Sequence, residues 1–165
     1  MTDPCSPGAG VVLYGLRRLL LVLHAGGSIV LIGASTHHAL QMRHYLRGRF
    51  GREKLEKTYA QVVSVAYLVT FALGALLYPS YRVHVRGYYL DRFAPVFSGL
   101  FDLKETYASL TLVIAVALGA LALTWRPAET PALVRVYAGM SFVICAVVWF
   151  DVIAGLLVVS ARGVG

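Results

Sequence analysis

The chain has 165 residues, of which 58% are hydrophobic and only 14% are charged, whereas about a quarter of a typical soluble domain is charged. One soluble core of this size has no room for so many apolar side chains, so the composition excludes an ordinary soluble domain. The formal charge of +7 comes without an RNA-binding motif. It therefore argues against nucleic-acid binding and for basic loops beside an anionic membrane leaflet.

Four stretches of the chain are apolar enough to cross a bilayer, which takes about 20 mainly apolar residues. The spans are expected at about 19–40, 59–78, 106–125 and 134–160. The first is expected to continue as a helix past the bilayer to Leu46. The second and third are expected to stop before Pro79 and Pro127, because proline lacks the amide hydrogen that a helix interior needs. The sequence predicts an all-α fold, an integral membrane four-helix bundle that forms a single membrane domain.

The leader, residues 1–10, has neither a basic start nor a small-residue cleavage site after an apolar run. We therefore expect the first helix itself to direct the chain to the membrane. Cys5 lies in this leader and Cys145 in the fourth apolar stretch. Since the two are not expected to meet, the sequence indicates neither a disulfide nor a thiolate metal site.

An aromatic-rich segment, residues 80–105, separates the second and third spans. Its aromatic residues are Tyr81, Tyr88, Tyr89, Phe93, Phe97 and Phe101. Aromatic residues mixed with arginines suit a segment that lies in the membrane interface, although an ordinary folded loop would also carry them. Because freely solvated segments contain few aromatic residues, we expect this one to be ordered against the bundle or the membrane surface.

Basic residues indicate how the chain is oriented. The loop between the first two spans carries Arg43, Arg47, Arg49, Arg52, Lys54 and Lys57. The loop between the last two carries Arg126 and Arg135. Because Lys and Arg in short loops favour the cytoplasmic side, we expect both loops inside and both termini outside. The excess of Arg over Lys, with much Ala, Gly and Leu, indicates a GC-rich bacterial genome, and we therefore expect a bacterial cytoplasmic membrane. The two sides are not fully distinguished by their basic residues. Six basic residues fall on the expected outer side: Arg17, Arg18, Arg82, Arg86, Arg92 and Lys104.

Small residues occur where helices are able to approach closely. Gly26 and Gly33 are seven residues apart and share a face of the first helix, and Ala115 and Gly119 form a small-xxx-small pair in the third. Close helix packing in lipid uses such residues. The pattern predicts a compact bundle or an oligomer.

Asp151 lies well inside the fourth span, where an acid costs about 2.5–3.5 kcal/mol. Three explanations of an acid at this depth stay open: a structural hydrogen bond within the bundle, a proton or ion site, or a protonated side chain. His24 is the natural partner, since it lies about 7–8 Å and Asp151 about 13 Å below the outer ends of their helices. A His24–Asp151 pair would relieve the desolvation of both groups. The alternative for His24 is a core histidine bonded to a backbone or hydroxyl oxygen.

A second histidine group stands at the cytoplasmic end of the first helix. His37, Gln41 and His44 share one face, and His38 and Met42 share another. Helical histidine spacing is able to bind a transition metal, but no carboxylate or cysteine completes this set. A polar helix end among the lipid headgroups explains it more simply.

Haem b is a separate hypothesis. His24 and His38 are fourteen residues apart, an interval found in di-haem b-type cytochromes, where each histidine needs an axial partner from another helix. The other three spans contain no histidine, and His84 lies in the outer segment. The sequence therefore supports a haem within one chain only weakly.

The start of the third span carries Asp102, Lys104 and Glu105. Acidic residues at a helix N-terminus interact favourably with its dipole and free amides, and this explains Asp102 and Glu105. The functional alternative is an outer polar mouth that these residues share with Arg17, Arg18 and Asp151.

No nucleophile triad, phosphate loop or zincin motif stands in the sequence, so it indicates no class of enzyme. The expected function is a non-enzymatic accessory or structural subunit of a larger membrane complex, for example a respiratory or other energy-converting one. The alternatives are a b-type haem or metal protein in electron transfer, and a small proton- or ion-coupled transporter that uses His24 and Asp151. The expected partners are the lipid bilayer and other membrane subunits or a second copy, with no nucleic acid.

The orientation is testable with reporter fusions along the chain. Fusions at Gly51 and Pro131 should report the cytoplasm and one at Gly165 the opposite side, because the basic loops resist translocation. A cytoplasmic signal from the Gly165 fusion would contradict this orientation.

Overall fold

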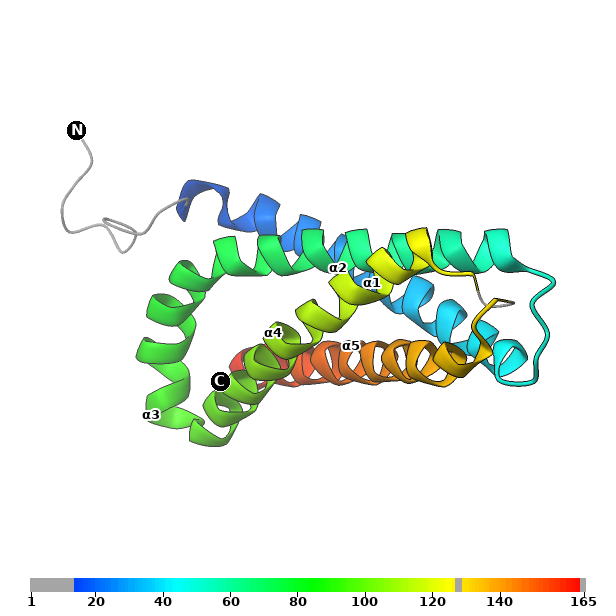
Figure 1. Ribbon diagram of the computed structural model, residues 1–165. Coiled ribbons are helices and arrows are strands. Elements are labelled where there is room, and N and C mark those ends of the chain that lie inside the picture. Colours follow the sequence, from blue (N-terminus) through cyan, green and yellow to red (C-terminus); the bar gives the residue numbers. More distant parts are fainter. Residues whose placement is uncertain (1–13, 127–128, 164–165) are drawn as a thin grey trace.

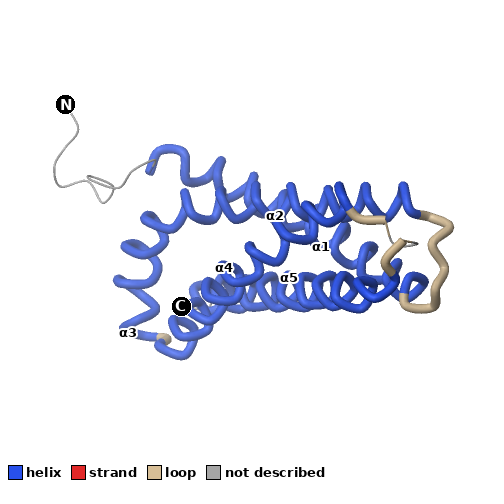
Figure 2. Tube along the Cα trace, in the orientation of Figure 1, coloured by secondary structure: helices blue, strands red, loops and turns tan. Residues whose placement is uncertain are grey.

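The computed structural model describes residues 14–126 and 129–163, and within these ranges the chain is helical and has no strand. After the 3-10 turn Tyr14–Leu16 come α1 (Arg17–Tyr45) and α2 (Glu53–Tyr81) (Figures 1 and 2). A π-helix (Arg82–Leu90) and the short α3 (Asp91–Phe93) lead to α4 (Pro95–Thr124). A 3-10 turn (Pro131–Leu133) precedes α5 (Val134–Gly163). The leader with Cys5, and Pro127, lie outside the described residues.

The four long helices form one bundle in which α1 and α4 each pack against both α2 and α5. The connections after α1 and after α4 lie at one end, and the start of α1, the π-helix and the end of α5 lie at the other (Figure 1). Large side chains that are fully buried, such as Met42, Val63, Leu118 and Ile144, form the core. The predicted all-α four-helix fold is confirmed.

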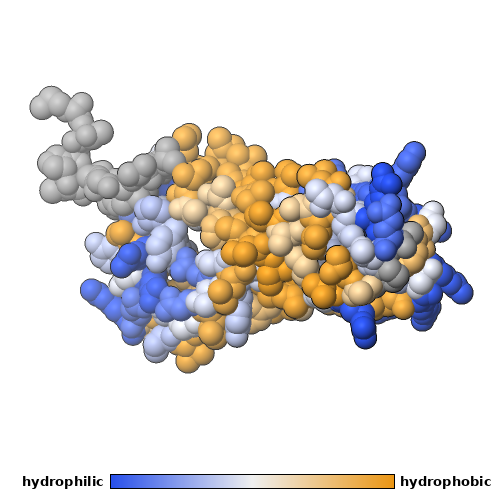
Figure 3. Space-filling model, in the orientation of Figure 1, coloured by the Kyte–Doolittle hydropathy of each residue, from blue (hydrophilic) through white to orange (hydrophobic). Residues whose placement is uncertain are grey.

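The face of the bundle shown in Figure 3 is apolar in its middle and polar at both ends. Each long helix is apolar enough to span a membrane, yet only 17% to 28% of its most apolar stretch is buried inside the protein. So many outward-facing apolar side chains are stable in lipid and not in water. The chain is an integral membrane protein with four candidate spans.

The predicted end of the second helix and the predicted start of the third helix are wrong. The second helix was expected to stop before Pro79, but α2 continues through Pro79 to Tyr81 and then into the π-helix. A proline removes one amide hydrogen bond, and a helix absorbs this by bending; the chain does bend beyond this point (Figure 1). The third helix was expected from about Thr106, but α4 begins at Pro95, because proline suits the first position of a helix. The extension of the first helix to about Leu46 is confirmed.

The aromatic-rich segment is ordered against the bundle, as expected, and folds across the end opposite the basic loops (Figure 1). Arg86 donates two hydrogen bonds to the Asp102 carboxylate, at 2.6 and 2.9 Å. The rings of Tyr81 and Phe101 stack with centroids 4.1 Å apart, and the Tyr89 hydroxyl donates to the Ala161 carbonyl at the end of α5. These contacts hold the π-helix, α4 and α5 together.

The two pairs of small residues face in different directions. Ala115 is fully buried, its carbonyl accepts a hydrogen bond from the Ser64 hydroxyl at 2.7 Å, and a Cβ added at Gly119 would lie 2.7 Å from the same hydroxyl. These residues therefore bring α2 and α4 close, as predicted. A Cβ added at Gly26 or Gly33 would meet nothing within 4 Å. The glycine face of α1 points out of the bundle.

Candidate functional site

A cluster of buried polar side chains lies near the end of the bundle that carries the basic loops. It consists of His38 and Tyr45 from α1, Glu56 from α2, and Tyr137 and Ser141 from α5. Each of the five is at most 3% exposed. Charged residues are almost never buried to this degree unless they are paired, so the cluster is the most informative polar feature of the described chain.

Glu56 is the centre of this cluster. Its Oε1 atom accepts hydrogen bonds from the Tyr137 hydroxyl at 2.5 Å and from His38 Nε2 at 2.9 Å. Its Oε2 atom accepts a longer one from the Tyr45 hydroxyl at 3.4 Å. The other ring nitrogen of His38, Nδ1, lies 2.7 Å from the Ser141 hydroxyl oxygen. Two neighbouring helices, α1 and α5, thus supply the donors that make a buried carboxylate tolerable.

Helical spacing brings these residues together. His38 and Tyr45 are seven residues apart on α1, and Tyr137 and Ser141 are four apart on α5, so each pair shares a helix face. Glu56 lies in the first turn of α2, where the helix dipole favours an acid. The Trp125 ring packs on Tyr137 with centroids 5.0 Å apart and covers the cluster with apolar surface.

The sequence predicted no role for Glu56, because it stands among the arginines and lysines of a loop that was expected to be solvated. The sequence nevertheless contains a helical pattern that indicates burial of Glu56. Glu56, Ala60, Val63 and Tyr67 follow one another at intervals of four, three and four residues, and all four are buried. Glu56 therefore occupies the first position of the buried stripe of α2.

The four residues of the weak metal hypothesis, His37, His38, Met42 and His44, do not gather at one point. His37 stacks on Tyr59, His38 is bound in the cluster, Met42 is in the core and His44 is exposed. In the part of the chain that the structure describes, no group of three or more His, Cys, Asp or Glu is placed to hold a metal ion. The reason is that these positions lie on different sides of one helix.

The paired histidines do not fit a di-haem arrangement. His24 donates from Nδ1 to the Thr70 carbonyl at 2.9 Å, which leaves Nε2 for another partner. His38 has both ring nitrogens engaged, with Glu56 and Ser141. An iron ligated by His38 would have to break one of these buried hydrogen bonds, and we derive no haem chemistry from the pair.

A second polar group lies toward the end opposite the basic loops, and it contains His24, Lys104 and Asp151. The hydrogen bond of His24 to the Thr70 carbonyl is the backbone contact that the sequence left open as an alternative. Asp151 Oδ1 is buried and has no hydrogen-bond partner among the described residues. Lys104 acts electrostatically on both His24 and Asp151. No hydrogen bond or ion pair in the described ranges joins His24 directly to Asp151, so Lys104 is the charged group common to the two.

The structure brings part of the predicted outer mouth together: Asp102 and Lys104 act electrostatically on Glu105, and Lys104 also acts on Asp151. Asp102 is bound to Arg86, which the hypothesis did not include, and Lys104 lies 5.7 Å from the centre of the Phe101 ring. Glu105 and Arg17 are partly buried, and Arg18 is exposed. The sequence missed Arg86 as the partner of Asp102 because the two are separated by the turn from the π-helix to α4.

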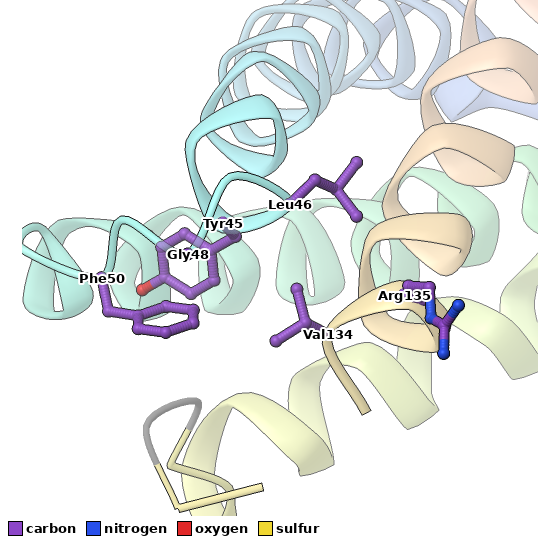
Figure 4. Close-up of a pocket in the computed structure, with 6 residues that line it drawn as sticks. All are labelled: Tyr45, Leu46, Gly48, Phe50, Val134 and Arg135. Carbon is purple, nitrogen blue, oxygen red and sulfur yellow. The ribbon is translucent and has the colours of Figure 1, made fainter. Parts of the chain in front are cut away.

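A surface pocket of about 260 Å³ opens at the basic end beside the buried cluster. Figure 4 shows its lining: Tyr45, Leu46, Gly48, Phe50, Val134 and Arg135. Gly48 has φ = 71°, a conformation that favours glycine, and it turns the chain after α1. The Tyr45 ring packs edge-to-face on Phe50. Tyr45 therefore lines the pocket and also reaches Glu56 with its hydroxyl.

Comparison with family models, with curated proteins and with solved structures found no match.

The cost of disrupting the buried cluster is testable by replacing its central acid. Glu56→Ala should destabilise the protein by about 3–5 kcal/mol, because it leaves His38 and two hydroxyls buried without their partner. Glu53→Ala serves as the control, since Glu53 forms an i,i+4 ion pair with Lys57 at 2.7 Å between partly exposed side chains and should cost at most about 0.5 kcal/mol. Reversible unfolding in mixed micelles measures both. Equal losses would contradict the structural importance of the cluster.

Proposed function

We propose that the protein is a non-enzymatic four-span subunit of a larger membrane complex, and that it binds its partner through the outer face of α1 and α2. The observation that carries the proposal is an apolar groove between these two helices. Its volume is about 440 Å³. It is lined by Gly27, Val30, Gln61, Val62, Val65, Ala66, Val69 and Thr70.

The groove suits a helix of a partner protein. Gly26 and Gly33 are open on the outer face of α1, and glycines let a neighbouring backbone approach closely. The groove also contains two polar groups. Gln61 is exposed, and Thr70 Oγ1 is buried without a hydrogen-bond partner in the described chain. An unpaired amide is costly beside lipid, and a polar side chain on a partner helix would pair with the exposed Gln61. Lipid tails offer no such group.

The hydrogen bonds and ion pairs between the helices favour a subunit over an enzyme. Glu56 and His38 are bound to each other and to hydroxyls, and Asp102 is bound to Arg86. Both pairs hold helices together, and the Glu56–His38 pair is buried away from any substrate. We place the subunit in a bacterial cytoplasmic membrane with both basic loops inside and both termini outside, in keeping with the charges of the loops.

A second candidate function is favoured by Asp151. Its Oδ1 atom is buried without a hydrogen-bond partner in the described ranges, and Lys104 is the charged group that acts on it. A membrane-embedded acid beside a cation marks a proton or ion pathway in many transporters. The second candidate is therefore a small proton- or ion-coupled transporter that uses Asp151, with His24 nearby through Lys104.

The subunit proposal is testable by blocking the glycine face of α1. Gly26→Leu combined with Gly33→Leu should reduce the recovery of a partner protein after purification in mild detergent by roughly tenfold, equivalent to about 1.4 kcal/mol. Gly139→Leu is the matched control, because Gly139 is on α5 and a Cβ there also meets nothing within 4 Å. Equal recovery of the same partner with both variants, or the absence of any partner with the native chain, would contradict the proposal.

The transporter candidate is testable by flux measurements in liposomes. Asp151→Asn should abolish a proton- or ion-dependent flux while expression stays normal, because the amide keeps the shape of the side chain and removes its charge. Glu129→Gln is the control, since Glu129 is exposed and pairs with Arg126 at the other end of the bundle. If the native protein supports no flux, or if both variants keep it, this candidate is wrong.

A further inference from the structure

The basic end of the bundle carries more positive charge than its acidic residues neutralise. Glu53 pairs with Lys57 at 2.7 Å. Glu129 pairs with Arg126 at 3.1 Å, and the third acid, Glu56, is buried in the cluster. The other basic side chains at this end are exposed and form no ion pair with a described residue: Arg43, Arg47, Arg49, Arg52, Lys54 and Arg135. Water and counter-ions are able to balance such charge, so it defines a ligand only where a shaped site accompanies it.

The surface pocket of about 260 Å³ lies within this charged region. The turn after α1 lines the pocket with every second residue: Leu46, Gly48 and Phe50. Arg47 and Arg49 occupy the two positions between them and are exposed. The turn therefore combines an apolar pocket wall with two arginines that have no acidic partner in the described chain.

The start of α5 forms the opposite wall of the pocket. Val134 and Arg135 both line it, and they lie across the pocket from Phe50 and Tyr45 (Figure 4). Arginines from two separate parts of the chain, the turn after α1 and the start of α5, thus border one pocket.

Hydrogen bonds and ring packing fix the walls of the pocket. The backbone amide of Gly48 donates to the Tyr45 carbonyl at 2.9 Å, and that of Arg49 donates to the His44 carbonyl at 3.0 Å. The rings of Tyr45 and Phe50 pack edge-to-face with centroids 5.2 Å apart, and the Tyr45 hydroxyl is held in the buried cluster. A ligand would bind to a surface that is already ordered, which reduces the entropic cost of binding.

The position of the pocket suits a phospholipid headgroup. The pocket lies where two candidate spans end, since α1 ends at Tyr45 and α5 begins at Val134, and headgroups flank the hydrocarbon core at this level of a bilayer. Two large apolar side chains beside the pocket are exposed, Leu46 by 48% and Leu133 by 43%. The first carbons of an acyl chain would cover these leucines, whereas a phosphate ion in solution has no apolar part to do so.

The chemistry of the pocket suits an anionic headgroup. A guanidinium group is planar and pairs with two phosphate oxygens at once. Basic pockets between transmembrane helices bind the headgroups of anionic lipids. The volume of about 260 Å³ is below the roughly 300–1,000 Å³ of a pocket for a drug-sized ligand. It therefore fits a phosphate with its nearest carbons better than a whole lipid, whose chains would remain in the bilayer.

We propose that this pocket binds the headgroup phosphate of an anionic phospholipid, with Arg47, Arg49 and Arg135 as the phosphate-binding residues. Leu46 and Leu133 contact the adjoining carbons of the lipid. The bound lipid joins the turn after α1 to the start of α5. The inference requires that the chain lies in a membrane, and it is independent of the partner subunit and of the direction in which the chain is inserted.

The proposal is testable by native mass spectrometry of the full chain in detergent, with phosphatidylglycerol or phosphatidylcholine added. The native chain should bind phosphatidylglycerol at least about tenfold more tightly than phosphatidylcholine, because only the former has net negative charge. Arg47→Gln combined with Arg135→Gln should weaken the binding of phosphatidylglycerol by roughly thirtyfold, about fivefold for each arginine. Both arginines are exposed, so neither replacement removes a buried contact.

The matched control is Lys57→Gln combined with Arg126→Gln. It removes the same two positive charges from the same end, but these residues are paired with Glu53 and Glu129 and do not line the pocket. It should weaken the binding of phosphatidylglycerol by less than about threefold, the effect of a screened surface charge. Equal weakening by the two double variants would show a general charge effect and overturn the proposal.

Two further results would overturn the proposal. The first is equal affinity of the native chain for the two lipids. The second is displacement of phosphatidylglycerol by inorganic phosphate at the same concentration, which would show that the pocket takes a soluble anion and gains nothing from the lipid carbons. Should the double variant not fold, Arg47→Gln alone, compared with Lys57→Gln, makes the same distinction with an expected difference of about fivefold.

Discussion

A carboxylate buried among apolar helices is the constraint on which the arrangement of this bundle depends. In lipid, apolar surfaces gain little from packing on one another, so contacts between small residues and polar side chains set which helices meet and in what register. Glu56 requires donors that its own helix does not supply, and α1 and α5 provide them through His38 and Tyr137. The small-residue contact at Ala115 and Gly119 then places α4 beside α2. The opposite end is closed by the contacts of Arg86 with Asp102.

The polar groups inside the protein divide into two sets with different properties. Around Glu56 each carboxylate oxygen has a donor, and the set adjoins a pocket at the basic end. Around Asp151 one carboxylate oxygen has no hydrogen-bond partner in the described chain. The outer surface of α1 adds a third feature, the open glycine face beside an apolar groove. The proposed membrane subunit accounts for the third feature through a partner helix on this face, and the first feature holds α1, α2 and α5 together.

The sequence predicted the number and approximate place of the four helices, because about 20 apolar residues are needed for each span. It did not predict that α2 passes through Pro79 or that α4 begins at Pro95, since a proline is compatible with both the end and the start of a helix. The depth of His24 and Asp151 was estimated from helix rise, but rise does not tell which way a side chain points. Glu56 was overlooked because its neighbours in sequence are basic and solvated, while its partners in space are 11 to 81 residues away.

The central claim is that His38 and Glu56 act as one coupled unit within the bundle. A double-mutant cycle tests it most directly: the free energy of unfolding in mixed micelles is measured for the native chain, for His38→Ala, for Glu56→Ala and for the double variant. The account predicts a coupling free energy of about 1–3 kcal/mol, because either single change already leaves the other group buried without its partner. Losses that add within about 0.5 kcal/mol would show that the two residues act independently, and would contradict the account.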